Sequence, residues 1–330
     1  MILHPAVLAL LIGSLLTGFM LLHASYHGVR ILTRWDMRSG SELQLSLERR
    51  TYLVSIILSY TLAFQLLSLF LFIYTADALH GLFTGAMCAA GTLNANPFGY
   101  PLLIMKVINF LLAGIWLIIN HADTRGYDYP LIRIKYALLL NITPLVLLEI
   151  FLEFEYFLGL HADVITSCCG SIFSIDKPGI AGDLVSLPAG PMEAAFFVGM
   201  AATAAAGLYF CSKGKGGYIF SALSSFTFLI AAASLISFIC LYFYELPTHH
   251  CPFCILQQEY GHIGYLLYLT LLGGGVAGLG TGVLMPLRRV GSMGRVIPKL
   301  QQKLAVICLL FYLLFTLTVS WRMIYSSFKL

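Results

Sequence analysis

The chain has 330 residues, of which 59% are hydrophobic and only 10% are charged. Soluble proteins carry about a quarter charged residues, so this composition excludes an ordinary soluble fold. The net charge of +4 comes from basic residues in the turns between apolar runs, which indicates membrane topology rather than a nucleic-acid surface. We therefore expect the lipid bilayer, and no nucleic acid, to be the main partner of one membrane domain over residues 1–330.

Apolar stretches recur along the whole chain, each about as long as the roughly 20 residues that cross a bilayer as a helix. They predict an all-α, polytopic transmembrane helical bundle of about eight spans. The expected spans are 5–27, 52–76, 102–120, 136–160, 190–210, 218–244, 261–285 and 304–327. The first span lacks the small-residue cleavage site of a signal peptide, so we expect it to be retained. Within the seventh span, Gly274, Gly278 and Gly282 share one helix face, which favours close helix packing.

Most of the 19 basic residues lie in alternate turns, namely 28–51, 121–135, 211–217 and 286–303. Because cytoplasmic turns carry the excess of Lys and Arg, this asymmetry predicts that both termini lie outside. The expected location is a bacterial-type inner membrane, crossed several times.

The turns assigned to the outside hold most of the eight cysteines, namely Cys88, Cys168, Cys169, Cys251 and Cys254. The outer compartment is oxidising, so thiols there form disulfides or bind metal. Disulfides that staple loops are one interpretation. An odd number of cysteines leaves at least one thiol for another role, which favours chemistry over stapling.

The sharpest motif is the run from His249 to Cys254, HHCPFC, before the seventh span. Pro252 suits the first position of a helix, so Cys251 is expected to cap that helix and to place its thiolate at the positive end of the dipole. Such a position makes Cys251 the expected nucleophile. The spacing of Cys251 and Cys254 suits metal chelation equally well.

The segment Cys251-Pro-Phe-Cys254-Ile255 resembles the CxxC of the bacterial quinone-linked disulfide-generating enzymes of the DsbB type and, more loosely, that of vitamin K epoxide reductases. The resemblance implies that this pair passes electrons to a quinone, while a second outer pair exchanges with a periplasmic thioredoxin-like protein. Gln258 stands where the DsbB type typically carries an arginine. Gln258 and His262 are the candidate cofactor-binding residues.

Cys168 and Cys169 are adjacent, and a disulfide between neighbours closes a strained ring. We expect one of them to bridge to Cys88 or to the CPFC pair, or both to bind a soft metal such as Cu(I) or Zn(II). Mixed Cys and His sets are normal ligands of these metals. The candidate metal ligands are His249, His250, Cys251, Cys254, Cys168 and Cys169.

Ionisable residues inside the expected spans are few. Glu149 and Glu153 lie four apart, hence on one face of the fourth span, and Lys106 lies at a similar depth in the third. We expect Lys106 and Glu153 to form an ion pair and Glu149 to take up or release protons beside the redox centre. A purely structural salt bridge is the alternative.

These features favour an outward-facing thiol–disulfide redox protein that would act as an oxidoreductase. Its candidate catalytic residues are Cys251, Cys254, Cys168, Cys169, Cys88 and Glu149. Its expected partner is a periplasmic thioredoxin-like protein or a metallochaperone. One alternative is a metal-handling protein that binds copper, zinc or an iron–sulfur group. Another is a structural subunit of a respiratory or cytochrome-maturation complex.

Overall fold

A computed structural model of the chain describes residues 3–36, 41–126, 129–161, 164–166, 173 and 180–329. The structure is 81% helical, and its described part contains no strand beyond an isolated bridge between Thr84 and Ile165. Eight of the described helices are long and apolar enough to cross a membrane. The chain is therefore a multi-pass membrane protein.

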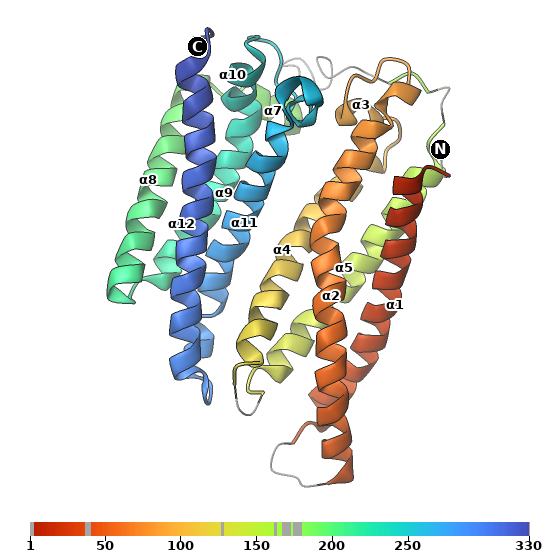
Figure 1. Cartoon of the computed structure of the whole chain (residues 1–330), viewed down its shortest axis with the longest axis vertical. Helices are drawn as coiled ribbons and strands as arrows, with labels where there is room; N and C mark the ends of the chain where they lie inside the picture. Colours follow the sequence, from red (N-terminus) through yellow and green to blue (C-terminus); the bar gives the residue numbers. More distant parts are fainter. Residues whose placement is uncertain are drawn as a thin grey trace. The chain divides into compact units, whose positions relative to one another are not determined.

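The long helices overlap all of the predicted spans (Figure 1). They are α1 (Pro5–Arg34), α2 (Glu42–Ala78), α4 (Gly99–Asp123), α5 (Ile132–Leu158), α8 (Ala189–Lys213), α9 (Gly217–Ser234), α11 (Ile263–Val283) and α12 (Met293–Tyr325). A π-helical turn, η2 (Leu235–Ile239), and α10 (Cys240–Tyr244) continue α9. Shorter elements are η1 (His80–Leu82), α3 (Ala89–Leu93), α7 (Ile180–Val185), η3 (Cys254–Leu256), η4 (Gln258–Tyr260) and η5 (Pro286–Arg289).

Contacts within the chain group into two compact units. Unit 1 comprises Met1–Thr75, Asn96–Leu160 and Pro286–Leu300, and unit 2 comprises Ala76–Ala95, His161–Met285 and Gln301–Leu330. That the whole chain forms one membrane domain, with both termini outside, stays a prediction.

The core of unit 1 lies between α1, α2, α4 and α5. Helix α5 packs against both α1 and α4. Trp116 and Tyr136 are fully buried there, and the indole Nε1 of Trp116 donates to the carbonyl of Lys135 at 3.0 Å. A buried indole needs such a partner, since a bare N–H in an apolar core is costly.

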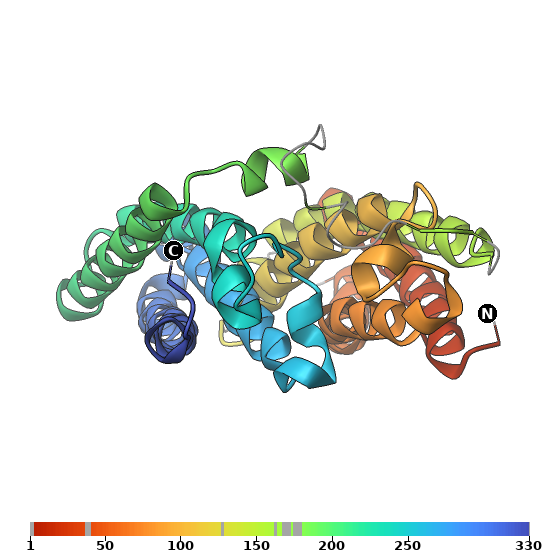
Figure 2. The same ribbon diagram turned by 90° about the horizontal axis from the view of Figure 1, so that it is seen from above.

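In unit 2, α9 packs between α8 and α11, and Figure 2 shows these helices as neighbours when seen from above. The predicted glycine face of α11 is confirmed as a packing face. A Cβ at Gly278 would lie 1.9 Å from Ser224 Oγ, and a Cβ at Gly282 would lie 2.3 Å from Ser221 Oγ. Only glycine lets α11 approach α9 this closely.

Candidate thiol centre and buried ion pairs

The thiols of Cys88, Cys251 and Cys254 form a buried cluster in unit 2. Their three Sγ atoms lie within 4.8 Å of one another, and Cys88 Sγ is 3.6 Å from Cys251 Sγ. Cys88 and Cys251 are completely buried, and Cys254 is 6% exposed. Residues 163 positions apart in the sequence are thus brought to one point.

Two tyrosine hydroxyl groups hold the CPFC loop in place. Tyr244, the last residue of α10, donates to the carbonyl of Cys251 at 2.5 Å and accepts the N–H of Ile255 at 2.9 Å. Tyr268 on α11 donates to the carbonyl of Pro252. Because each phenol carries a rigid ring with a polar tip, the loop backbone is fixed on both sides of the thiols.

Polar contacts of Asp77 and Gln257 hold the loop that carries Cys88 close to the CPFC loop. Cys88 is the residue that precedes α3, and Asp77 Oδ1 at the end of α2 accepts the N–H of Ala89 at 3.1 Å. The Gln257 amide donates to the same Asp77 oxygen at 3.4 Å and to the carbonyl of Met87 at 2.8 Å. Gln257 and Asp77 therefore link the loop that carries Cys88 to the chain just after Cys254.

The two neighbouring histidines have different surroundings. His249 Nε2 lies 3.3 Å from Cys254 Sγ, and its ring packs edge-on against Tyr244 at 4.5 Å between centroids. His250 instead bonds through Nδ1 to the carbonyl of Ile236, at 2.9 Å, within the π-helical turn η2. A π turn interrupts the regular helical ladder, so such a carbonyl is open to a side-chain partner. Of the two histidines proposed as metal ligands, only His249 has a described contact with a thiol.

The expected cap on the seventh span is wrong. Helix α11 begins at Ile263, and the residue before it is His262, with φ 55°. Cys251 lies in irregular chain, because the segment after the motif forms the short turns η3 and η4 instead of continuing as a helix. Pro252 thus lies within a loop that begins after Tyr244, and the α11 dipole does not act on Cys251.

The candidate cofactor-binding residues Gln258 and His262 both have exposed side chains. His262 Nδ1 bonds to the carbonyl of Leu256 at 2.6 Å, which fixes the orientation of its ring. Both residues follow the thiol pair on the same irregular segment.

Cys168 and Cys169 lie outside the described residues. The chain shortly before them is described. Thr166 donates its N–H to the carbonyl of Thr84 at 3.0 Å, on the segment that leads to Cys88. Position 85 requires glycine for two reasons. Its φ of 89° is one that other residues rarely adopt, and the Thr166 carbonyl oxygen lies too close to where a Cβ atom would be.

No family model, curated protein or solved structure matches the chain.

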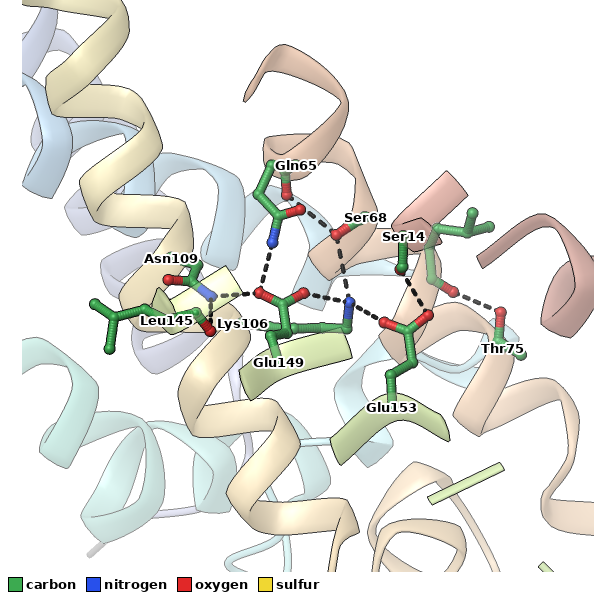
Figure 3. Close-up of polar contacts among 10 residues, drawn as sticks. Ser14, Gln65, Ser68, Thr75, Lys106, Asn109, Leu145, Glu149 and Glu153 are labelled. Atoms are coloured by element: carbon green, nitrogen blue, oxygen red, sulfur yellow. Dashed lines mark hydrogen bonds and ion pairs between the residues drawn. The ribbon is translucent and has the colours of Figure 1, made fainter. Parts of the chain in front are cut away.

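Unit 1 contains the expected intramembrane charges (Figure 3). Lys106 Nζ lies 2.7 Å from Glu153 Oε2, so the predicted contact between the two groups is confirmed, and it lies 2.7 Å from Glu149 Oε1 as well. All three side chains are at most 2% exposed. Glu149 is thus itself bound to the lysine, which the sequence pattern alone did not indicate.

A second buried ion pair in unit 1 was not predicted. Lys135 Nζ on α5 lies 2.7 Å from Asp123 Oδ2 at the end of α4. It also donates to Ser55 Oγ and Asn120 Oδ1, each at 3.1 Å. Lys135 and Asp123 both lie in the segment 121–135, which the sequence pattern assigned to the cytoplasmic side. The basic residues there were interpreted only as signals of membrane topology.

The thiol cluster has two possible chemistries. Three sulfur atoms this close can form alternative disulfides by exchange, since a thiolate attacks the sulfur of a neighbouring disulfide. Three thiolates can also bind a metal ion. With zinc–sulfur bonds of about 2.3 Å, the edge of a tetrahedral site is about 3.8 Å, which is close to the separation between Cys88 and Cys251.

Proposed function

We propose that the protein is a membrane thiol–disulfide redox protein with Cys88, Cys251 and Cys254 as its resident thiols. The supporting observation is the distance of 3.6 Å between Cys88 Sγ and Cys251 Sγ, with Cys254 Sγ within 4.8 Å of both. Cys251 can therefore pair with either of two neighbours without a large movement of the backbone.

Disulfide exchange among the three cysteines needs no external oxidant or reductant. Starting from a Cys251–Cys254 disulfide, the Cys88 thiolate attacks Cys251 Sγ, a Cys88–Cys251 bond forms, and Cys254 leaves as a thiolate. The net number of electrons on the protein does not change in this step. His249 Nε2, 3.3 Å from Cys254 Sγ, is placed to give a proton to the leaving thiolate.

Net turnover requires an external dithiol and an electron acceptor. We propose that a periplasmic thioredoxin-like dithiol gives up two electrons and two protons through Cys168 or Cys169, and that a quinone accepts them. When bound, the quinone would supply the two-electron sink. The exposed amide of Gln258 would donate a hydrogen bond to a quinone carbonyl oxygen. His262 donates its Nδ1–H to the carbonyl of Leu256, so its Nε2 is an acceptor that would bind a hydroxyl group of the reduced quinone. We propose that the thiol centre lies at the outer face of a bacterial-type inner membrane, because the basic turns predict that orientation.

One observation favours a second candidate function, the binding of a soft metal ion. The three Sγ atoms are donors of the type that Zn(II) and Cu(I) prefer and lie within 4.8 Å of one another, and His249 Nε2 lies 3.3 Å from one of them, Cys254 Sγ. In that case the protein would handle metal for a metallochaperone partner, and the same thiols would be ligands rather than redox groups.

Trapping variants distinguish the two functions. Under mild oxidation, Cys254→Ser should accumulate a Cys88–Cys251 disulfide, and Cys88→Ser should accumulate a Cys251–Cys254 disulfide, each read by alkylation and peptide mass. Cys308→Ser is the matched control, since Cys308 is equally buried in α12 but contacts Ser224 instead of the cluster. Absence of both disulfides, together with one tightly held zinc or copper ion per chain, would refute the redox proposal and support the metal site.

A further inference from the structure

The Lys106 cluster in unit 1 contains two carboxyl groups and one ammonium group. Every described helix packed around it adds a neutral partner. Ser14 comes from α1, Gln65 and Ser68 come from α2, and Asn109 comes from α4 (Figure 3). If all three charged groups were ionised, the cluster would carry one net negative charge within membrane-spanning helices. Such a charge is costly at that depth.

The two carboxyl groups are bonded very differently. Glu149 accepts well-aligned hydrogen bonds from Lys106 at 2.7 Å, from Gln65 at 2.5 Å and from Asn109 at 2.6 Å. Three donors directed at one carboxyl group stabilise its charged form. Glu149 is therefore the permanent counter-ion of Lys106.

Glu153 has fewer donors. Ser14 Oγ lies 2.8 Å from Oε1, and a hydroxyl group can accept a hydrogen bond as readily as it donates one. Glu153 Oε2 lies 2.7 Å from Lys106 Nζ but accepts no hydrogen bond from a neutral group among the described residues. A proton on Glu153 would remove the excess charge and could be donated to Ser14.

We propose that Glu153 is a proton-binding site of unit 1, with Lys106 and Glu149 as a fixed ion pair that positions it. The exchangeable proton thus resides on Glu153 and not on Glu149, the residue that the sequence pattern favoured. A metal cation is a poor alternative occupant, because the Lys106 ammonium already lies 2.7 Å from an oxygen of each carboxyl group.

Infrared spectroscopy of the purified full chain in lipid nanodiscs tests the proposal. A protonated carboxylic acid has a carbonyl stretch distinct from that of a carboxylate. At neutral pH the difference between wild type and Glu153→Gln should contain one such band, and the band should shift in heavy water because the proton exchanges. Glu153→Gln keeps the shape of a protonated glutamate, so it should fold.

A second variant assigns the proton to its residue. Ser14→Ala should shift the band, because it removes the partner of the protonated carboxyl. Thr17→Val is the matched control, since Thr17 is also a buried hydroxyl residue of α1, and none of the hydrogen bonds described here for the cluster involves it. Three results would each overturn the proposal: no such band in the wild type, a band indifferent to Ser14→Ala, or a band abolished when sodium replaces choline in the buffer.

Discussion

The Lys135–Asp123 pair allows a quantitative test of how much one buried charge matters in this fold. The two side chains are 1% and 0% exposed, and their charged atoms are 2.7 Å apart. Asp123→Asn keeps the shape of the side chain and an acceptor for the N–H of Leu131, which now bonds to Oδ1 at 2.9 Å. The substitution therefore removes mainly the charge and leaves the Lys135 ammonium buried without a counter-ion.

Breaking a buried pair in this way costs about 3–5 kcal/mol, which is roughly a hundredfold to several thousandfold in the folding equilibrium. The assay is unfolding of the purified protein by a denaturing detergent, followed by circular dichroism. Removing both charges, in Asp123→Asn with Lys135→Met, should recover most of the loss, because no uncompensated charge then remains.

The matched control is Glu245→Gln in unit 2. Its ion pair with Arg322 spans 3.2 Å, and the two side chains are 39% and 34% exposed, respectively. A solvated pair of this kind contributes about 0–1 kcal/mol. If Asp123→Asn destabilised the protein no more than Glu245→Gln does, the reasoning from burial and charge would be refuted.

Three further predictions follow from packing, from the loop contacts and from charge. Gly278→Ala should destabilise the protein by about 1–3 kcal/mol through overpacking against α9, whereas Gly81→Ala, with nothing within 4 Å of its Cβ position, should be near neutral in the same unfolding assay. Gln257→Leu removes the amide that bonds to the carbonyl next to Cys88, so alkylation of Cys88 should become faster; an unchanged rate would argue against this link. A periplasm-only reporter inserted at Lys213 should be inactive and a cytoplasm-only reporter active, and the reverse result would overturn the predicted orientation.

The sequence predicted the spans because lipid imposes a simple requirement on length and polarity. It underestimated several helices at their ends. Helix α1 continues to Arg34 and α2 begins at Glu42, beyond the apolar stretches that defined the predictions. Hydropathy reports only the part of a helix that lies in the hydrocarbon region, whereas backbone hydrogen bonding continues into polar residues.

The candidate site was less predictable, because its geometry depends on contacts between distant segments. The motif identified Cys251 and Cys254, but the close approach of Cys88 depends on Asp77 and Gln257, which are ordinary polar residues in the sequence. The supposed helix cap failed for a related reason. Proline at the start of a helix is a frequent pattern, yet here Pro252 lies within an irregular loop whose backbone bonds to tyrosine side chains.

The hydroxyl group of Tyr244 bonds to two backbone points, one at Cys251 and one at Ile255, so it spans the whole CPFC loop. These two hydrogen bonds restrict the backbone of the loop, so the loop needs little rearrangement when a sulfur atom changes its disulfide partner. Tyr244→Phe would keep the aromatic ring and remove both hydrogen bonds to the loop backbone. The loop would then rearrange each time a bond between sulfurs was made or broken, and the rate of exchange would be set by backbone motion rather than by the thiols.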